Sequence, residues 1–366
     1  MSAINHTFAT LDQLAQFDAV IDVRSPSEFA EDHIPGAINC PVLNDEERAR
    51  VGTLYKQDSP FAARKVGAAL VSRNAALHLE TQFAGWPKSW RPLVYCWRGG
   101  QRSGAMTHIL REVGWPAKRL QGGYKTWRHF VLQQLEELPP KFQFLVVAGP
   151  TGSAKTRILE ALQRQGHQVL NLEALAAHKG SVLGVLPGIS QPSQKMFETT
   201  VMDTLRVFDS SRPVFVESES RTVGQLRLPA AVYQGIQGGR WLQVQADRTE
   251  RVNFLLKDYD YFLQGTDLET YLDRLKELCG REVVQSWKMM ARNGEFATLV
   301  DALLTQHYDR HYQRSLQRDV AQSVAPDVAS VAETPRVEAR DLSPAGIELL
   351  ASVIAGTFGV SGLKTT

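Results

Sequence analysis

One short stretch, from Phe144 to Thr156, constrains the fold of this chain more than any other and reads FLVVAGPTGSAKT. Its apolar start, FLVV, is typical of a buried parallel strand. A loop with two glycines and a Lys-Thr pair follows, and helical apolar spacing resumes at Ile158. Strand, glycine-bearing loop, Lys-Thr and helix in this order predict a phosphate-binding loop, in which backbone N–H groups and the lysine hold an anion.

The predicted loop has a defined set of phosphate-binding residues and one departure from the usual pattern. The set is Gly149, Thr151, Gly152, Ser153, Ala154, Lys155 and Thr156. Thr156 would place its hydroxyl near a metal that bridges the phosphates. The pattern asks for glycine at Ala154, and the extra methyl group disfavours a positive φ there. An ordinary strand-to-helix turn with an exposed lysine is the alternative.

Composition places the chain among ordinary globular proteins. Its 366 residues are 43% hydrophobic and 22% charged, which predicts about two to three domains with cores of normal size. A net charge of +2 is too small to indicate a nucleic-acid binder by itself, so any such site must be a local patch. The three cysteines form neither a paired framework nor a metal spacing, which fits a reducing cytoplasm.

Neither end of the chain predicts a membrane segment. The N-terminal residues lack the apolar core of a signal peptide. The apolar stretch 346–363 is interrupted by Glu348 and several glycines, so it predicts a packed terminal helix rather than a membrane span.

Residues 1–135 alternate short strands with helices and therefore predict a parallel α/β sheet. Strands are expected at 17–23 and 91–95, and Ser25 with Glu28 predicts a capping box at the start of a helix. Ligands of such sheets bind at the carboxyl ends of the strands, where Cys96 lies.

Cys96 opens the loop CWRGGQRS, which leads into a helix expected at 104–113. The predicted anion loop comprises Trp97, Arg98, Gly99, Gly100 and Arg102. Helix-start N–H groups and nearby arginines are expected to lower the pKa of the Cys96 thiol and make it a nucleophile. A buried, inert cysteine is the alternative, and we interpret Cys40 and Cys279 as packing residues of that kind.

The first domain resembles the rhodanese family of sulfur carriers. The resemblance rests on IDVRSPSEFAEDHIPGAIN, CWRGGQRS and LQGGYKTW. It implies that Cys96 carries a persulfide or its selenium analogue, and that Asp22 and Arg24 are mainly structural. The Cys-x5-Arg spacing to Arg102 is longer than in the common rhodanese loop and resembles that of cysteine phosphatases. A phosphatase-like or arsenate-reductase-like activity is therefore the local alternative, although no general acid is evident.

A charged, proline-containing linker is predicted at 136–142, followed by a P-loop domain at 143–265. Further strands are expected at 168–172, 213–217 and 241–244, and 178–192 is a long loop of the kind that is usually functional or mobile.

A second motif of the P-loop domain follows its strand at 213–217. It comprises Glu217, Glu219, Ser220 and Arg221 on the ligand-bearing edge of the sheet. Either glutamate could hold a metal or its water shell opposite Thr156, and a plain salt bridge is the alternative. Arg248 and Arg251 open a later helix, where they suit phosphate clamping or are solvated helix charges.

Residues 266–366 form the predicted C-terminal helical region, with one helix at 296–318 and a flexible connector at 319–340. On that helix His307, His311, Arg314 and Arg318 share a face, beside Tyr308 and Tyr312. A basic stripe beside aromatic rings suits an RNA backbone and a stacked base. The alternative is a solvated helix face, and no further ligand cluster supports zinc at the two histidines.

Taken together, the two domains resemble the bacterial tRNA 2-selenouridine synthase family, on the residues YCWRGGQRS, GPTGSAKT, ESESRTVG and HYDRHY. The resemblance implies a cytoplasmic transferase that replaces sulfur by selenium in 2-thiouridine at the tRNA wobble position. It also implies that selenophosphate donates the selenium and that S-geranylation by geranyl diphosphate comes first. The implied partner is tRNA carrying 2-thiouridine, an enzyme that supplies selenophosphate is a candidate partner, and no membrane is involved.

The expected fold is α/β, with a rhodanese-like parallel-sheet domain, a P-loop NTPase-like parallel domain and the helical region. Geranyl diphosphate and selenophosphate are expected as substrates, with no tightly bound cofactor. Mg²⁺ is the ion to consider at Thr156, but no metal site is assigned with certainty. The alternatives are a sulfurtransferase fused to a small-molecule kinase, and a non-catalytic RNA-binding module with a nucleotide switch.

Overall fold

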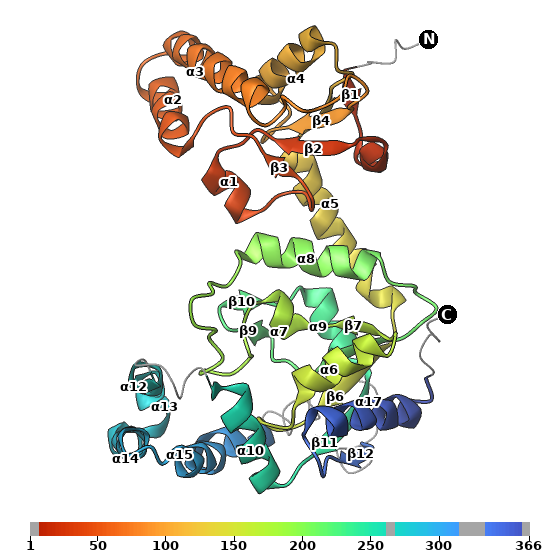
Figure 1. Cartoon of the computed structure of the whole chain (residues 1–366), viewed down its shortest axis with the longest axis vertical. Coiled ribbons are helices and arrows are strands. Elements are labelled where there is room, and N and C mark those ends of the chain that lie inside the picture. The colour runs from red at the N-terminus through yellow and green to blue at the C-terminus, as the bar shows by residue number, and fades with distance from the viewer. Residues whose placement is uncertain (1–6, 261–267, 315–333, 361–366) are drawn as a thin grey trace. The chain divides into compact units, whose positions relative to one another are not determined.

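The computed structural model describes residues 7–260, 268–314 and 334–360 (Figure 1). The chain divides into two compact units, Met1–Gln134 with Pro192–Asp203, and Leu135–Gln191 with Thr204–Thr366. Each unit contains a five-stranded parallel sheet with helices, so the predicted α/β class is confirmed. No helix in the described part of the chain is long and apolar enough to cross a membrane.

The sheet of the first unit has the strand order β1-β5-β4-β2-β3, and every pair is parallel. Its strands are β1 (Phe8–Ala9), β2 (Ala19–Asp22), β3 (Ile38–Asn39), β4 (Pro92–Tyr95) and β5 (Lys118–Leu120). All four residues of central β4 are buried, as expected of a parallel strand covered on both faces. The carboxyl end of β4 is where Cys96 begins its loop.

Six helical segments accompany this sheet, and four of them were not predicted. The segments are η1 (Leu11–Gln16), α1 (Pro26–Glu31), α2 (Asp45–Gln57), α3 (Pro60–Glu80), α4 (Gln101–Val113) and α5 (Tyr124–Glu137). The unpredicted segments are η1, α2, α3 and α5. Two of the unpredicted helices, α2 and α3, carry clear start signals, because Asn44 and Glu47 form a capping box and Ser59 accepts from the N–H of Ala62. Helix α4 begins at Gln101, earlier than predicted, so Arg102 lies in its first turn.

The sheet of the second unit has the order β12-β11-β6-β8-β7, again entirely parallel. Its strands are β6 (Phe144–Ala148), β7 (Gln168–Leu170), β8 (Val214–Glu217), β11 (Arg240–Gln245) and β12 (Arg336–Glu338), and a separate two-stranded hairpin joins β9 (Thr222–Val223) to β10 (Leu226–Arg227). Central β6 is buried throughout and leads directly into the predicted phosphate-binding loop.

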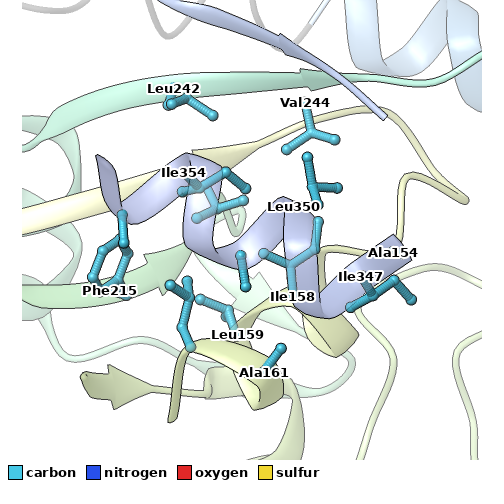
Figure 2. Packing of buried hydrophobic residues seen from close by; sticks show 14 of the residues in the cluster. Ala154, Ile158, Leu159, Ala161, Phe215, Leu242, Val244, Ile347, Leu350 and Ile354 are labelled. Carbon is cyan, nitrogen blue, oxygen red and sulfur yellow. The ribbon is translucent and has the colours of Figure 1, made fainter. Parts of the chain in front are cut away.

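Helices cover this second sheet and extend beyond it. They are η2 (Pro139–Lys141), α6 (Lys155–Arg164), α7 (Leu172–Leu175), α9 (Ala230–Gln237), α10 (Arg248–Asp258), α12 (Leu268–Asp273), α13 (Lys276–Cys279), α14 (Arg281–Arg292), α15 (Phe296–Leu303), the π-helix η3 (Leu304–Tyr308) and α17 (Pro344–Phe358), while α8 (Gln194–Arg206) belongs partly to each unit. Figure 2 shows α17 packed against α6 and β11, with Leu350 and Ile354 near Ile158 and Val244. The late apolar stretch is thus a packed helix, as predicted.

Two sequence-based boundaries need correction. The flexible connector was predicted through Arg340, but Arg336–Glu338 is β12, which pairs with β11 because both expose backbone groups in parallel register. The single helix predicted at 296–318 is interrupted by η3 at Leu304–Tyr308, and helical structure continues to Arg314. Arg318 lies outside the described residues.

Candidate active sites

The Cys96 thiol lies at the base of a loop that joins β4 to α4. The residue is only 3% exposed, and its Sγ lies 3.2 Å from Ser103 Oγ in the first turns of α4. The sulfur atom therefore lies beside the first turn of α4, where the partial positive charge of a helix start favours a thiolate. The position fits a nucleophile that is shielded from bulk water.

The segment that closes the first domain holds this loop in shape. The N–H of Tyr124 donates to the Cys96 carbonyl at 2.8 Å, and the N–H of Lys125 donates to the Trp97 carbonyl at 3.0 Å. Gly123 has φ +64°, and a Cβ there would lie 2.2 Å from the Cys96 carbonyl oxygen and 2.4 Å from the Gly99 nitrogen. Only glycine fits this position, which explains why the LQGGYKTW motif accompanies the cysteine loop.

Asp22 and Arg24 brace the sheet end near the loop, in agreement with the structural role that the rhodanese resemblance implied. Arg24 is buried and donates to both carboxylate oxygens of Asp22, and it also donates to the Asp32 carbonyl at 2.6 Å. Its guanidinium group lies 3.9 Å from the centre of the Tyr124 ring. Arg24 therefore ties the strand end to the closing segment.

The two arginines of the predicted anion loop have different surroundings. Arg102 forms a two-point ion pair with Glu28, with N–O distances of 2.6 and 3.2 Å. Burial raises the pKa of Glu28, but hydrogen bonds from Arg102 outweigh it and hold that pKa below its ordinary value. Arg98 and Gly100 are exposed, and Trp97 packs on Tyr124. Glu28 thus offsets the positive charge with which Arg102 would bind an oxyanion in a phosphatase-like site.

The predicted phosphate-binding loop joins β6 to α6. Ala154 adopts φ 58° and ψ 25°, the left-handed region that glycine usually occupies. Its methyl group is 4% exposed and belongs to the core cluster under α6 and α17. Lys155 Nζ donates to the Gly149 carbonyl at 2.8 Å, and Ser153 Oγ donates to the Pro150 carbonyl at 2.8 Å. Ala154 is therefore compatible with the loop, because packing offsets part of its backbone strain.

A cavity of about 460 Å³ lies over this loop and brings three predicted motifs together. Its lining includes Thr151, Gly152, Ser153, Ala154, Lys155 and Thr156 from the loop, Glu219 and Ser220 from the second motif, and His307, Tyr308, His311 and Tyr312 from the helical region. We call it the anion pocket. The remaining predicted residues of these motifs, Gly149, Glu217, Arg221 and Arg314, are not among its lining residues.

Three carboxylates from two neighbouring strand ends lie beside Thr156. Thr156 Oγ1 donates to Glu173 Oε2 at 2.5 Å, and the Glu173 N–H donates to Glu217 Oε1 at 2.9 Å. Burial, followed by the charge of Glu173, raises the pKa of Glu217 to about 8. Burial and both neighbouring glutamates also raise the pKa of Glu219 well above its ordinary value, against the opposing effect of Lys155. Glu217 and Glu219 therefore hold their protons to a higher pH than exposed glutamates do.

Glu173 was not predicted as a site residue, although the sequence contains a signal for it. Glu173 follows β7 closely, and β7 neighbours β8 in the sheet, so its carboxyl end meets that of β8. Among the described residues, no group of three or more His, Cys, Asp or Glu side chains is arranged to hold a metal alone. Mg²⁺ commonly takes only one or two protein oxygens together with substrate phosphates, and Thr156, Glu173 and Glu219 could supply these.

Cations at the rim of the anion pocket were also missed. Lys179 Nζ donates to Asp258 Oδ2 at 2.6 Å, and Arg157 donates to Asp258 Oδ1 at 2.7 Å. Burial raises the pKa of Asp258, but the two cations outweigh burial and hold it below its ordinary value. Lys179 and Arg157 are held in place by one shared carboxylate, and all three side chains line the anion pocket.

A second, apolar cavity of about 80 Å³ adjoins the anion pocket. It is lined by Thr151, Ser181, Leu183, Leu255, Leu256, Tyr259, Leu268, Tyr271, Leu299, Val300, Leu303, Leu304 and Tyr308. We call it the apolar pocket. Thr151, Ser181, Leu255, Tyr259 and Tyr308 line both cavities, so the two are contiguous at the phosphate-binding loop. The apolar pocket has room for about five to eight water molecules, which suits a short hydrocarbon chain.

Arg248 and Arg251 do not form the paired clamp that the sequence suggested. Arg251 is 5% exposed, donates to the Thr151 carbonyl at 2.9 Å and forms a two-point ion pair with Asp309. Arg248 is exposed and pairs with Asp301 instead. Arg251 therefore supports the phosphate-binding loop from outside the anion pocket.

The predicted basic stripe needs correction at His307. This residue is 4% exposed, its Nδ1 lies 3.3 Å from Cys279 Sγ, and its ring contacts that of His311 at a centroid distance of 4.6 Å. Burial, followed by the charge of His311, lowers the pKa of His307 to about 4, so its ring is neutral. The π-helix turns His307 inward because it shifts the helical phase. Contact of His311, Tyr312 and Arg314 with RNA stays a prediction.

Ser220 and Arg221 of the second motif also make contacts at the β9–β10 hairpin, and only Ser220 lines the anion pocket. Ser220 Oγ donates to the Thr222 carbonyl at 2.6 Å, and the Arg221 carbonyl accepts from the Leu228 N–H. Both contacts stabilise the β9–β10 hairpin, so the structural role of these two residues is clearer than a ligand-binding one.

Comparison with known proteins identifies relatives of both units. Residues 142–336 match the family model of the tRNA 2-selenouridine synthase AAA domain, and residues 7–130 match the rhodanese-like domain. A tRNA 2-selenouridine synthase of Nitrosomonas europaea is 38% identical over 244 residues, which are 66% of this chain and 63% of the relative. One from Shewanella denitrificans is 34% identical over 293 residues, 78% of this chain and 76% of the relative.

The extent of these matches is limited in two ways. The matched part covers less than two thirds of the Nitrosomonas europaea relative and, at 64%, of the Bdellovibrio bacteriovorus relative. A solved structure of a rhodanese-related protein from Thermoplasma volcanium is 17% identical and covers 34% of this chain and 92% of its own. Its TM-score of 0.23 is too low to support a fold assignment.

Proposed function

The chain belongs to the tRNA 2-selenouridine synthase family, and on that premise we propose that it replaces the sulfur of 2-thiouridine at the tRNA wobble position by selenium. The reaction would proceed in two steps, S-geranylation and then displacement of the geranylated sulfur. The proposed substrates are tRNA, geranyl diphosphate and selenophosphate, and the proposed location is the cytoplasm. An enzyme that supplies selenophosphate is a candidate partner.

The main support for the first step is that the anion pocket and the apolar pocket are contiguous. A prenyl diphosphate has a charged head and a hydrocarbon tail, and the two cavities meet at Thr151 in the phosphate-binding loop. The loop amides and Lys155 suit the diphosphate, while leucine and tyrosine side chains suit the chain. A nucleotide would bring a polar sugar and base, which the apolar pocket does not match.

In the first step, the thiouridine sulfur attacks the allylic carbon of geranyl diphosphate. A carbon–sulfur bond forms, the carbon–oxygen bond breaks, diphosphate leaves and the uracil N3 loses its proton. Lys155 and the loop N–H groups stabilise the negative charge that develops on the leaving diphosphate. Mg²⁺ bound near Thr156 would add positive charge to the same group.

In the second step, the selenium atom of selenophosphate attacks C2, geranyl thiol leaves with a proton, and water then cleaves the selenium–phosphorus bond and releases phosphate. Passage through a perselenide on Cys96 would need a two-electron oxidant such as a disulfide, because selenophosphate holds its selenium at the selenide level. The buried thiol position and the surrounding loop amides support a carrier role for Cys96, since a selenium adduct there would be protected from water.

The experiment is mass spectrometry of nucleosides digested from tRNA that carries 2-thiouridine. The purified full chain is incubated with geranyl diphosphate, with selenophosphate, and with both. We expect a geranylated nucleoside with the first donor and 2-selenouridine only when both are present. An unchanged nucleoside under every condition would refute the proposal, and ATP-dependent phosphorylation and phosphatase activity would then be assayed.

A further inference from the structure

A third cavity, of about 760 Å³, borders the phosphate-binding loop at Pro150 and has no role in the steps described above. It is lined by Pro150, Gln243, Gln245, Ala246, Asp247, Arg251, Asp309, Tyr312, Gln313, Glu338, Ala339 and Arg340. We call it the polar pocket. It lies at the carboxyl ends of β11 and β12, the edge at which parallel α/β sheets bind ligands.

Two glutamine side chains project into this region from one face of β11. Leu242 and Val244 are buried in the core, so the alternation of a strand places Gln243 and Gln245 on the opposite face. Gln243 Nε2 lies 3.5 Å from the Tyr312 hydroxyl oxygen. The wall therefore combines amide groups, which both donate and accept hydrogen bonds, with an aromatic side chain.

The charges of the polar pocket exclude the ligand class that suits the anion pocket. Three carboxylates line it against two guanidinium groups, so one negative charge is in excess. Arg251 pairs with Asp309, and Arg340 pairs with Glu338 at 2.8 Å. A phosphate group would meet no uncommitted cation among the described lining residues, whereas a neutral ring with hydrogen-bonding edges would meet complementary groups.

We propose that the polar pocket binds a nucleobase of the RNA substrate, the neighbour of the base that is modified in the anion pocket. Tyr312 lines both cavities, so it stands between the two binding positions. Single-stranded RNA is typically recognised with its bases unstacked, packed on aromatic rings and hydrogen-bonded along their edges. Gln243 and Gln245 supply the edge contacts and Tyr312 supplies the ring. This inference rests on the proposed tRNA substrate.

The test measures binding of a labelled anticodon stem-loop RNA that carries 2-thiouridine at the wobble position. Two further RNAs lack the base on the 5′ or the 3′ side of that position. We expect one of these abasic RNAs to bind the wild-type protein about tenfold more weakly, the range that stacking and edge contacts give. Gln243→Leu and Gln245→Leu should weaken binding of the intact RNA similarly and add little when the base is already missing.

Several controls separate the possible outcomes. Gln163→Leu changes an exposed glutamine on α6 and should leave every dissociation constant unchanged. Gln245 is exposed, so its substitution removes no buried contact and keeps the test valid if Gln243→Leu fails to fold. Equal losses from the missing base in wild-type and variant proteins, or no loss in either, would overturn the inference.

Binding is measured without geranyl diphosphate or selenophosphate, so failure of the proposed chemistry is distinguishable from failure of the pocket assignment. Suppose that the losses of RNA affinity from base removal and from the glutamine substitutions are non-additive, but no nucleoside is modified. The nucleobase pocket is then supported and the proposed function is refuted. If nucleosides are modified but the losses of RNA affinity are additive, only the assignment of the polar pocket is refuted.

Discussion

The Cys96 loop and the phosphate-binding loop are built on the same plan but surrounded by different side chains. Each follows the buried central strand of a parallel sheet and leads into a helix, β4 to α4 in one unit and β6 to α6 in the other. Each therefore presents backbone N–H groups to an anion. The shared plan explains why both loops could be recognised by residue pattern.

The surroundings of the two loops differ in space and in charge. At the first loop the thiol is buried, and Glu28 offsets Arg102. At the second, Lys155 lines the anion pocket, which continues into the apolar pocket. The first environment suits one covalently held atom, and the second suits a ligand with a charged head and an apolar tail. The same backbone device thus serves different chemistry because of what packs around it.

The largest effect on this comparison should come from Gly123→Ala, which affects only the Cys96 loop. The new Cβ would clash with the Cys96 carbonyl and also require a left-handed alanine. We expect a loss of about 3 kcal/mol or more in unfolding free energy of the first unit, measured by urea denaturation. Gly36→Ala is the matched control, since φ is +76° there but space is open, and should cost only about 1 kcal/mol. Equal costs would show that the closing segment does not brace the loop.

The next effect concerns the carboxylates of the second site, which have no counterpart at the first. The pKa of Glu217 is raised to about 8, so the folded protein holds a proton that the unfolded chain releases near pH 4.5. Its contribution to stability is full below pH 4.5 and is lost as pH rises towards 8. Glu217→Gln should remove this loss and stabilise the protein at pH 8.5 by about 2 kcal/mol.

Thermal unfolding across pH 4.5 to 8.5 measures the difference in stability between Glu217→Gln and the wild type. This difference should approach about 2 kcal/mol only near pH 8.5. Glu277→Gln changes an exposed glutamate and should follow the wild-type pH dependence. Parallel curves for Glu217→Gln and the wild type would contradict the buried-proton assignment.

Val300→Phe should sharpen the distinction between the two parts of the second site. Val300 lines the apolar pocket and is only half-buried, so a larger ring can be accommodated by filling the cavity. We expect the affinity for geranyl diphosphate to fall about tenfold, or about 1.4 kcal/mol. Inhibition by inorganic diphosphate, which lacks a tail, should not change. A loss of affinity for both ligands would indicate that the apolar pocket does not hold the chain.

The smallest effect is expected for Ala154→Gly, which restores the usual pattern of the phosphate-binding loop. Relief of a left-handed alanine gains about 1–2 kcal/mol, but loss of a buried methyl group costs about 0.8 kcal/mol. Greater freedom of the unfolded glycine costs a further 0.4–1 kcal/mol, approximately. The unfolding free energy should therefore change by less than about 1 kcal/mol. A larger loss of unfolding free energy would mean that packing of the Ala154 methyl group contributes more than about 0.8 kcal/mol.

Local sequence patterns were enough to predict the two loops and most strands, but not the residues that pack around them. The cysteine and Lys-Thr motifs are contiguous in sequence, and long apolar runs predicted β4, β6 and β8. Strand β12 was missed because it is short and half-exposed, follows a polar stretch and is defined only by pairing with β11.

The apolar pocket was missed for a related reason. Its lining comes from α10, α12, α15 and η3, and no local pattern records that these segments meet. The inward position of His307 was missed because ideal helical spacing cannot reveal a π turn. Packing between distant segments, rather than local propensity, decides these features.

The central claim, that the two loops serve different steps, is tested most directly by crossing two variants with two donors. Cys96→Ala and Lys155→Ala are each incubated with tRNA bearing 2-thiouridine and geranyl diphosphate, with and without selenophosphate, and the nucleosides are quantified by mass spectrometry. Lys257→Ala, an exposed lysine of α10, is the control. The account predicts that Lys155→Ala slows geranylation by at least about 100-fold, whereas Cys96→Ala retains geranylation and loses selenium incorporation. Loss of the same step in both folded variants would contradict it.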